Sequence, residues 1–142
     1  MRNSKFLIAI LVVLSAFVSC TKDPSGSDTS LSGIVVSGSW TVHLYSQNST
    51  DLTANYAGYT FEFKSGGALT ATKAGTTTSG IWAEVADSGK TKLVISWVGG
   101  AVPVALLEIE EDWVLNSKSS SLIELGNTSG SGVVTTLHFM KK

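Results

Sequence analysis

Apolar and polar side chains alternate with a period of two along most of the chain after residue 38, which is typical of β-strands with one buried face. We expect the apolar set of each stretch to face the interior and residues such as Tyr45 to face outward. The two clearest stretches place Trp40, Val42 and Leu44, then Tyr59, Phe61 and Phe63, on their apolar faces.

Turn signals divide this pattern into about eight short strands. Ser65-Gly66-Gly67 and Asp87-Ser88-Gly89-Lys90 are typical hairpin turns, and polar or glycine-rich segments separate the later apolar pairs. Strands at such short, regular spacing predict an all-β, antiparallel up-and-down meander that closes into a barrel or folds over as a sandwich. If it closes, the strand around Val42 pairs with the strand around Leu137, because only closure removes both sheet edges.

One segment, residues 98–107, breaks the alternation. It is glycine-rich and then aliphatic, with Pro103 near its middle and acidic residues after it. We expect a short helix near 102–110 that closes one end of the barrel and buries Leu106 and Leu107. The alternative is an apolar loop exposed to a partner.

The N-terminus has the pattern of a secretory signal. Arg2 and Lys5 precede an apolar stretch, residues 6–18, that is too short to span a bilayer comfortably, and small Ser19 precedes Cys20. Cys20 is the only cysteine in the sequence, which excludes disulfides within the chain and a zinc-thiolate site.

The run from Leu14 to Cys20 resembles the lipobox of bacterial lipoproteins, and Phe17 in place of the usual Leu is a variant similar to Bacteroidetes-type lipoproteins. The resemblance implies cleavage before Cys20, lipidation of its thiol and acylation of the new amino terminus. It therefore predicts a signal peptide at 1–19, a lipidated flexible tether at 20–37 and one domain at 38–142. The expected location is the outer membrane, on its periplasmic face or at the cell surface.

The net charge and the distribution of lysines limit the classes of partner that we expect. Removal of residues 1–19 takes away two basic residues, so the formal net charge falls from −1 to −3. The remaining lysines are scattered and form no basic run, which argues against nucleic-acid binding. The membrane, reached through the lipid, is the first expected partner.

Gly38-Ser39-Trp40 looks like the Gly-x-Trp that opens the first strand of lipocalins and fatty-acid-binding proteins. With the strands that follow, residues 38–142 resemble the small lipocalin-like lipoproteins of gut Bacteroidetes, most of which have no known function. This resemblance implies a lipocalin-like barrel, with Trp40 closing one end of it.

The aromatic residues allow two interpretations. They could line a pocket for a small apolar ligand, or they could fill a barrel that is only just wide enough for its own side chains. Trp82 competes with Ile81 for the inward face. The possible ligand-lining residues are Trp40, Tyr59, Phe61, Trp97 and Trp113.

The remaining polar clusters carry weaker signals. The acidic run Glu108, Glu110, Glu111 and Asp112 lacks the ligand order of a calcium loop, so we interpret it as a solvated helix end. His43 and His138 become neighbours in a closed barrel, but a metal site needs a third donor. We expect no metal, no cofactor and no enzymatic activity, because no catalytic motif appears.

Two functional hypotheses follow. The first is a lipid-anchored binding protein that carries or senses a small apolar ligand inside the barrel. The second is an envelope or cell-surface interaction module with a solid barrel, which meets another envelope protein or a glycan through its outer face or through residues 98–107. A continuous internal cavity favours the carrier, whereas a packed interior with an exposed apolar patch favours the module.

Overall fold

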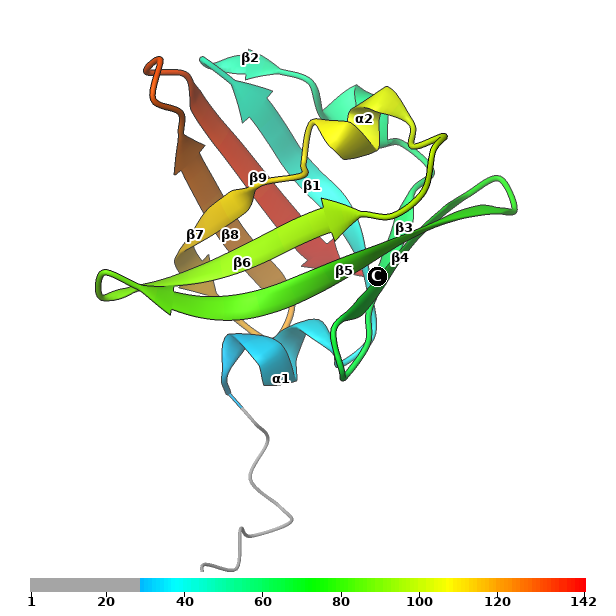
Figure 1. Ribbon diagram of the computed structural model, residues 1–142, viewed down its shortest axis with the longest axis horizontal. Helices are drawn as coiled ribbons and strands as arrows, with labels where there is room; N and C mark the ends of the chain where they lie inside the picture. Colours follow the sequence, from blue (N-terminus) through cyan, green and yellow to red (C-terminus); the bar gives the residue numbers. More distant parts are fainter. Residues whose placement is uncertain (1–28) are drawn as a thin grey trace, which may run out of the picture.

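The computed structural model describes residues 29–142, which form a closed antiparallel barrel of eight strands with one extra short strand (Figure 1). The fold is all-β and up-and-down, as predicted. None of the helices in the described part of the chain is long and apolar enough to cross a membrane. The elements are α1 (Leu31–Val35), β1 (Ser39–Gln47), β2 (Thr50–Asp51), the 3-10 helix η1 (Thr53–Tyr56), β3 (Thr60–Phe63), β4 (Ala68–Lys73), β5 (Thr76–Asp87), β6 (Lys90–Trp97), α2 (Val104–Leu107), β7 (Asp112–Lys118), β8 (Leu122–Thr128) and β9 (Val134–Lys141).

The barrel closes through the pairing of its first and last long strands. Val42 lies opposite Phe139 and Tyr45 lies opposite Leu137 in the β1–β9 ladder. The predicted pairing of these two strands is therefore confirmed. The short strand β2 pairs only with the end of β1, so it stands outside the closed ring.

The expected facing of β1 is wrong in its second half. The ladder with β9 shifts register between Val42 and Leu44, so one extra residue is inserted there. A bulge of this kind reverses the alternation beyond it. As a result Tyr45 is buried, with 1% of its surface exposed, while Leu44 is only half-buried and His43 is exposed.

The predicted short helix is present as α2, but it buries a different pair of residues. Leu106 and Ile109 are fully buried, whereas Leu107 is 49% exposed. The helical part spans only four residues, and Pro103 takes the N-cap position rather than the first helical one. Ile109 lies three residues after Leu106 and takes the inward place expected for Leu107.

The predicted tether, residues 20–37, ends too late. Its last part forms α1, which folds onto the barrel and buries Leu31 and Val35 completely. These residues are four positions apart and so share one helix face. The Ser30 hydroxyl accepts a 2.9 Å hydrogen bond from the Gly33 amide and caps the helix. The folded domain therefore begins near residue 30, not 38. Residues 1–28, with the predicted signal peptide and Cys20, lie outside the described residues.

Candidate functional site

Two short helices close the two ends of the barrel, and Figure 1 shows them at opposite ends. We call one end the α1 pole; it comprises α1, the turns at 64–67 and 118–121, and the C-terminal residues 141–142. We call the other end the α2 pole; it comprises residues 98–111 and residues 50–56. Both poles and the interior between them are the places where the predicted functional residues lie.

Aromatic rings run in contact along the interior from one pole toward the other. The centroid of Phe61 lies 6.4 Å from that of Trp97 and 5.3 Å from that of Phe139. Phe139 is in turn 5.6 Å from Phe63, which is 5.8 Å from Trp82. Such separations are those of packed aromatic pairs. The rings therefore contact one another along the axis.

The structure brings the five possible ligand-lining residues into the core. Trp40, Phe61 and Trp113 have no exposed surface, and Tyr59 and Trp97 are each 8% exposed. Trp82 is also buried, at 8%, whereas Ile81 is 55% exposed, so the tryptophan takes the inward position. Whether a ligand ever separates these rings stays a prediction.

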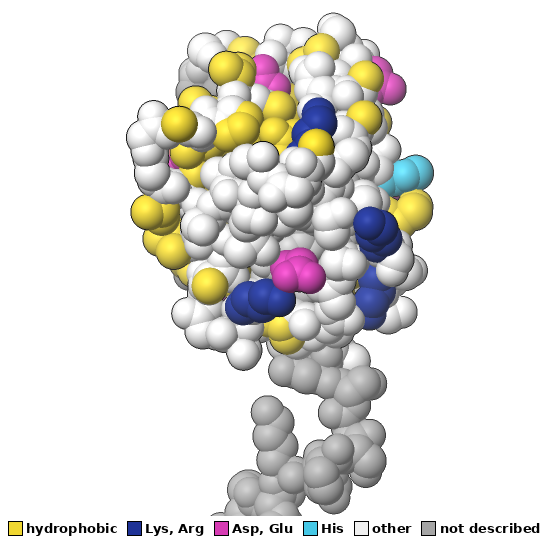
Figure 2. Space-filling view, turned by 90° about the vertical axis from the view of Figure 1, so that its right-hand side faces the viewer, with side chains coloured by type: hydrophobic (Ala, Val, Ile, Leu, Met, Phe, Trp, Pro, Cys, Tyr) yellow, Lys and Arg dark blue, Asp and Glu magenta, His cyan; other side chains and the backbone are white. Residues whose placement is uncertain are grey.

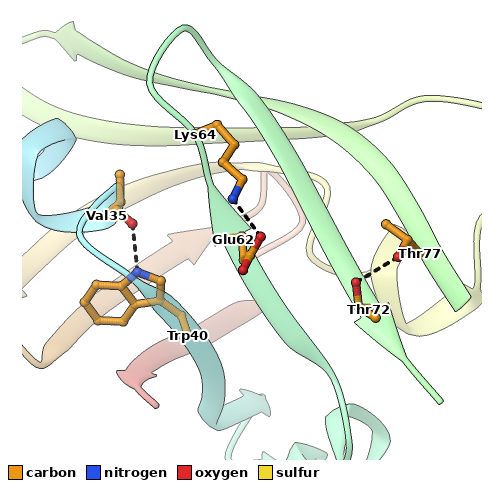
Figure 3. Close-up of polar contacts among 6 residues, drawn as sticks. All are labelled: Val35, Trp40, Glu62, Lys64, Thr72 and Thr77. Atoms are coloured by element: carbon orange, nitrogen blue, oxygen red, sulfur yellow. Dashed lines mark hydrogen bonds and ion pairs between the residues drawn. The ribbon is translucent and has the colours of Figure 1, made fainter. Parts of the chain in front are cut away.

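At the α1 pole, Trp40 holds the helix over the barrel end. Its indole Nε1 donates a 2.8 Å hydrogen bond to the Val35 carbonyl at the end of α1 (Figure 3). The amide and hydroxyl of Ser32 both donate to the Glu84 carboxylate on β5, the amide at 2.8 Å. The expected role of Trp40 at one end of the barrel is confirmed in this form.

Gly38, immediately before β1, is favoured there by its backbone conformation. Its φ of +146° is one that residues with a side chain rarely adopt. A Cβ at this position would come within 3.0 Å of the Lys141 side chain, not of Trp40. The Lys141 side chain could move aside, so the backbone conformation is the stronger reason for the glycine.

Lysine side chains gather at the α1 pole. Lys118 donates from Nζ to the Thr29 carbonyl, and Lys141 donates from Nζ to the Ser37 hydroxyl at 3.1 Å. Lys142 reaches the Thr60 hydroxyl at 3.3 Å, and Lys64 pairs with Glu62 at 2.7 Å (Figure 3). The α1 pole of the barrel therefore has a cationic rim.

At the α2 pole, two further tryptophans bind the cap. Trp97 Nε1 donates to the Leu106 carbonyl at 2.7 Å, and Trp113 Nε1 donates to the Ile109 carbonyl at 3.0 Å. The Tyr45 hydroxyl donates to the Glu108 carbonyl at 3.2 Å. The backbone carbonyls at the end of this short helix are thus satisfied from inside the barrel.

Two tyrosines lie beneath this cap. The rings of Tyr45 and Tyr56 are 5.0 Å apart in an edge-to-face arrangement. Burial, reinforced by the negative charge of Glu108, raises the pKa of the Tyr45 hydroxyl. Burial also raises the pKa of Tyr56, with smaller contributions from Tyr45 and Glu108. Both hydroxyls are therefore neutral at physiological pH. The sequence did not predict this buried tyrosine pair, because Tyr45 was expected to face outward.

The outer side of the α2 pole is apolar and acidic. Val98, Val104 and Leu107 are 59%, 73% and 49% exposed. Figure 2 shows apolar side chains gathered over this end of the visible face, with lysines mainly toward the other end. The exposed acids Glu108, Glu110 and Glu111 flank these side chains, and Glu110 also accepts hydrogen bonds from Ser96 and from the Trp97 amide.

Hollows lie on the outside of the barrel within the described residues. One of about 660 Å³ runs beside the tip of the β5–β6 hairpin and over β7 to β9. Two more, of about 400 and 610 Å³, flank α1 on either side. Of the four tryptophans, only Trp82 lines any of the three.

The histidine and acidic side chains considered as metal ligands do not come together in a metal site within the described residues. His138 Nδ1 lies 3.9 Å from Glu124 Oε1, and His43 points to solvent. Within residues 29–142, no three histidine, cysteine or acidic side chains gather where they could hold a metal ion.

The comparisons with known proteins bear on the fold. No protein family model matches the sequence, and no curated protein matches it. Among solved structures, the chain is similar to the crystal structure, at 1.00 Å resolution, of a DUF4847 family protein from Bacteroides vulgatus ATCC 8482. The TM-score is 0.56 at 17% sequence identity, and the alignment covers 80% of this chain and 98% of that chain. This chain therefore has the barrel fold of a Bacteroides protein, which agrees with the expected Bacteroidetes-type barrel.

Proposed function

We propose that this chain is a lipid-anchored interaction module of the outer membrane, with a solid barrel that presents its α2 pole to a protein partner. One observation carries the proposal: all four indole N–H groups bind backbone carbonyls of the chain itself, at Val35, Lys64, Leu106 and Ile109. Buried indole N–H groups normally find a hydrogen-bond partner. Here all four find it within the chain, so none of them is left to orient a ligand.

The carrier hypothesis requires the same aromatic residues and helices to move apart when a ligand enters. A ligand between Phe61 and Trp97 would have to separate two rings whose centroids are 6.4 Å apart. It would also have to pass α1 or α2, each of which is bound to the barrel by tryptophan. An interaction module needs neither change.

The membrane attachment rests on Cys20. Eight residues separate it from Thr29, where the described chain begins at the α1 pole. Acyl chains at Cys20 provide stable membrane binding only when two or more are present, as in the lipoproteins that its surrounding sequence resembles. The proposed tether therefore joins the described domain at the α1 pole, and the α2 pole lies at the other end of the barrel. No catalytic role is proposed.

The chemistry of the α2 pole indicates what kind of partner surface would fit it. Isolated apolar side chains are common on protein surfaces, but Val98, Val104 and Leu107 come from one ten-residue segment. The acidic residues beside them favour a partner with an apolar contact rimmed by lysine or arginine. We propose an envelope protein with that surface.

Anchoring is tested by metabolic labelling with radioactive palmitate. The wild-type protein should incorporate label and sediment with membranes, whereas Cys20→Ser should do neither. Equal labelling of the two proteins would exclude this assignment.

The partner surface is tested by photo-cross-linking in the native host. A photoreactive residue at Val104 should give one discrete cross-linked product, and the same residue at Thr72, on the outer face of β4, should not. Charge reversal at Glu108 and Glu111 should abolish the cross-linked product without changing the expression level of the protein. Saturable binding of fatty acids or sterols that changes tryptophan fluorescence, with no cross-link at Val104, would favour the carrier instead.

A further inference from the structure

The charges of the described chain are divided along the barrel axis. Of its seven lysines, four belong to the α1 pole: Lys64, Lys118, Lys141 and Lys142. Two acids lie among them, Glu62 in an ion pair with Lys64 and Glu84 bound to Ser32. The α2 pole instead carries Asp51, Glu108, Glu110 and Glu111.

We infer that the α1 pole docks on the anionic headgroups of the membrane that holds the lipid anchor, so that the barrel stands with its α2 pole away from the bilayer. The inference rests on the proposed lipidation of Cys20. It adds a second attachment, made by the folded domain, and it fixes the orientation of the partner surface.

The reach of the chain permits this contact. The nine steps along the chain from Cys20 to Thr29 span about 30 Å when fully extended, so Thr29 at the α1 pole is never farther than this from the lipidated residue. A tethered surface meets its target at a high effective concentration, and even weak attraction then shifts the equilibrium toward contact. Each lysine near an anionic leaflet adds to the attraction.

The same geometry keeps the acidic pole away from the bilayer. Strand β1 has nine residues, and at the usual tilt of barrel strands this length spans roughly 23 Å along the axis. The Debye length at physiological ionic strength is about 8 Å. The acids of the α2 pole are thus screened from the headgroups when the α1 pole is in contact, whereas the opposite orientation would press them against negative charge.

The polar contacts of the lysines are compatible with docking. Lys118 and Lys141 each make one hydrogen bond to a neutral oxygen, at Thr29 and Ser37. Lys142 likewise meets a neutral hydroxyl, at Thr60. The hydrogen-bond partners of all three are neutral, in contrast to that of Lys64. These three lysines are therefore the ones to test.

The experiment uses the mature lipidated protein in vesicles with a quencher attached to the lipid headgroups. Bimane is placed at Ser120→Cys in the α1 pole or at Val104→Cys in the α2 pole; both positions are exposed. Lipidation blocks the Cys20 thiol, so the introduced cysteine is the only one that reacts. We expect the ratio of Ser120 to Val104 quenching to rise about threefold when phosphatidylglycerol replaces phosphatidylcholine, and to fall back in about 0.5 M salt.

A matched pair of variants isolates the lysines. Lys118, Lys141 and Lys142 all changed to Gln should remove the rise, while the same three changed to Arg should keep it. Lys73, Lys90 and Lys92 changed to Gln remove as much charge from other parts of the barrel and should also keep it. Near-ultraviolet circular dichroism verifies that each variant is folded.

The possible failures are distinguishable. If the protein floats with vesicles but both reporters are quenched equally, or if the ratio ignores phosphatidylglycerol and the three lysines, the docked orientation is wrong and the anchor stands. If bimane labels Cys20 itself, the protein carries no thioether lipid. That result would overturn the proposed anchor and this inference together.

Discussion

The two poles of the barrel are closed by the same device but present opposite outer surfaces. At each pole, a tryptophan indole donates to a backbone carbonyl near the end of a short helix: Trp40 to Val35, and Trp97 to Leu106. Outside, the α1 pole carries lysines, and the α2 pole carries apolar and acidic side chains. Closure of the barrel constrains only the inward side of each helix, so the outward side is free to serve another purpose.

The apolar residues of the two helices make the contrast sharper. Both Leu31 and Val35 of α1 are fully buried. Of the four residues in α2, Leu106 is buried, while Val104 and Leu107 are largely exposed. Burial in the barrel therefore explains the apolar residues of α1 but only one of the large ones in α2. The proposed partner at the α2 pole would account for the others.

The largest expected effect comes from removing the α1 closure. Trp40→Ala deletes a fully buried indole together with its bond to Val35, and we expect a loss of about 3–5 kcal/mol in the free energy of unfolding. Chemical denaturation measures it. A loss below about 1 kcal/mol would mean that α1 and Trp40 do not close the barrel.

The next effect distinguishes a solid interior from a hollow one. Ala71 is fully buried on β4, directly opposite Phe61 on β3. In a packed barrel, Ala71→Phe forces a second ring against Phe61, and we expect a loss of about 1–3 kcal/mol. Ala83→Phe, at an exposed position on β5, is the control and should change little. A stable Ala71→Phe protein that no longer binds an apolar ligand would favour the carrier.

The barrel could be predicted from the sequence because period-two alternation directly encodes which face of a strand is buried. Trp40, Phe61 and Trp97 all lie on their predicted inward faces. The same rule failed at Tyr45, because the bulge after Val42 depends on how β1 pairs with β9, and a single strand carries no sign of it.

Helix α1 was not predicted from the sequence, for a different reason. Leu31, Ile34 and Val35 have helical spacing, but their stretch is short and otherwise rich in serine and glycine, so the periodicity does not stand out. The helix exists because the open barrel end provides a surface that buries Leu31 and Val35. One available signal was Ser30, a favoured N-cap residue immediately before Leu31.

A smaller effect separates the stability of the two caps. Ser30→Ala removes the hydroxyl that accepts from the Gly33 amide, and the loss of such a cap costs about 1 kcal/mol. We expect hydrogen exchange of the α1 amides to accelerate, while the amides of α2 and the strands keep their protection. Ser120→Ala, in the nearby β7–β8 turn, is the control. Acceleration throughout the domain would show instead that α1 unfolds only together with the barrel.

The smallest effect on stability is expected where we place the partner. Leu107→Ser exchanges a half-exposed side chain of α2 for a polar one, so the free energy of unfolding should change by no more than about 0.5 kcal/mol. Leu106→Ala, one residue earlier and fully buried, should cost about 2–5 kcal/mol. The free energy of unfolding of both variants is measured by chemical denaturation, and the cross-link at Val104 is measured in each of them. If Leu107→Ser keeps its stability and loses the cross-link, the exposed leucine serves the partner. A large loss of stability would show that Leu107 belongs to the cap, and the contrast between the poles would then be confined to their charges.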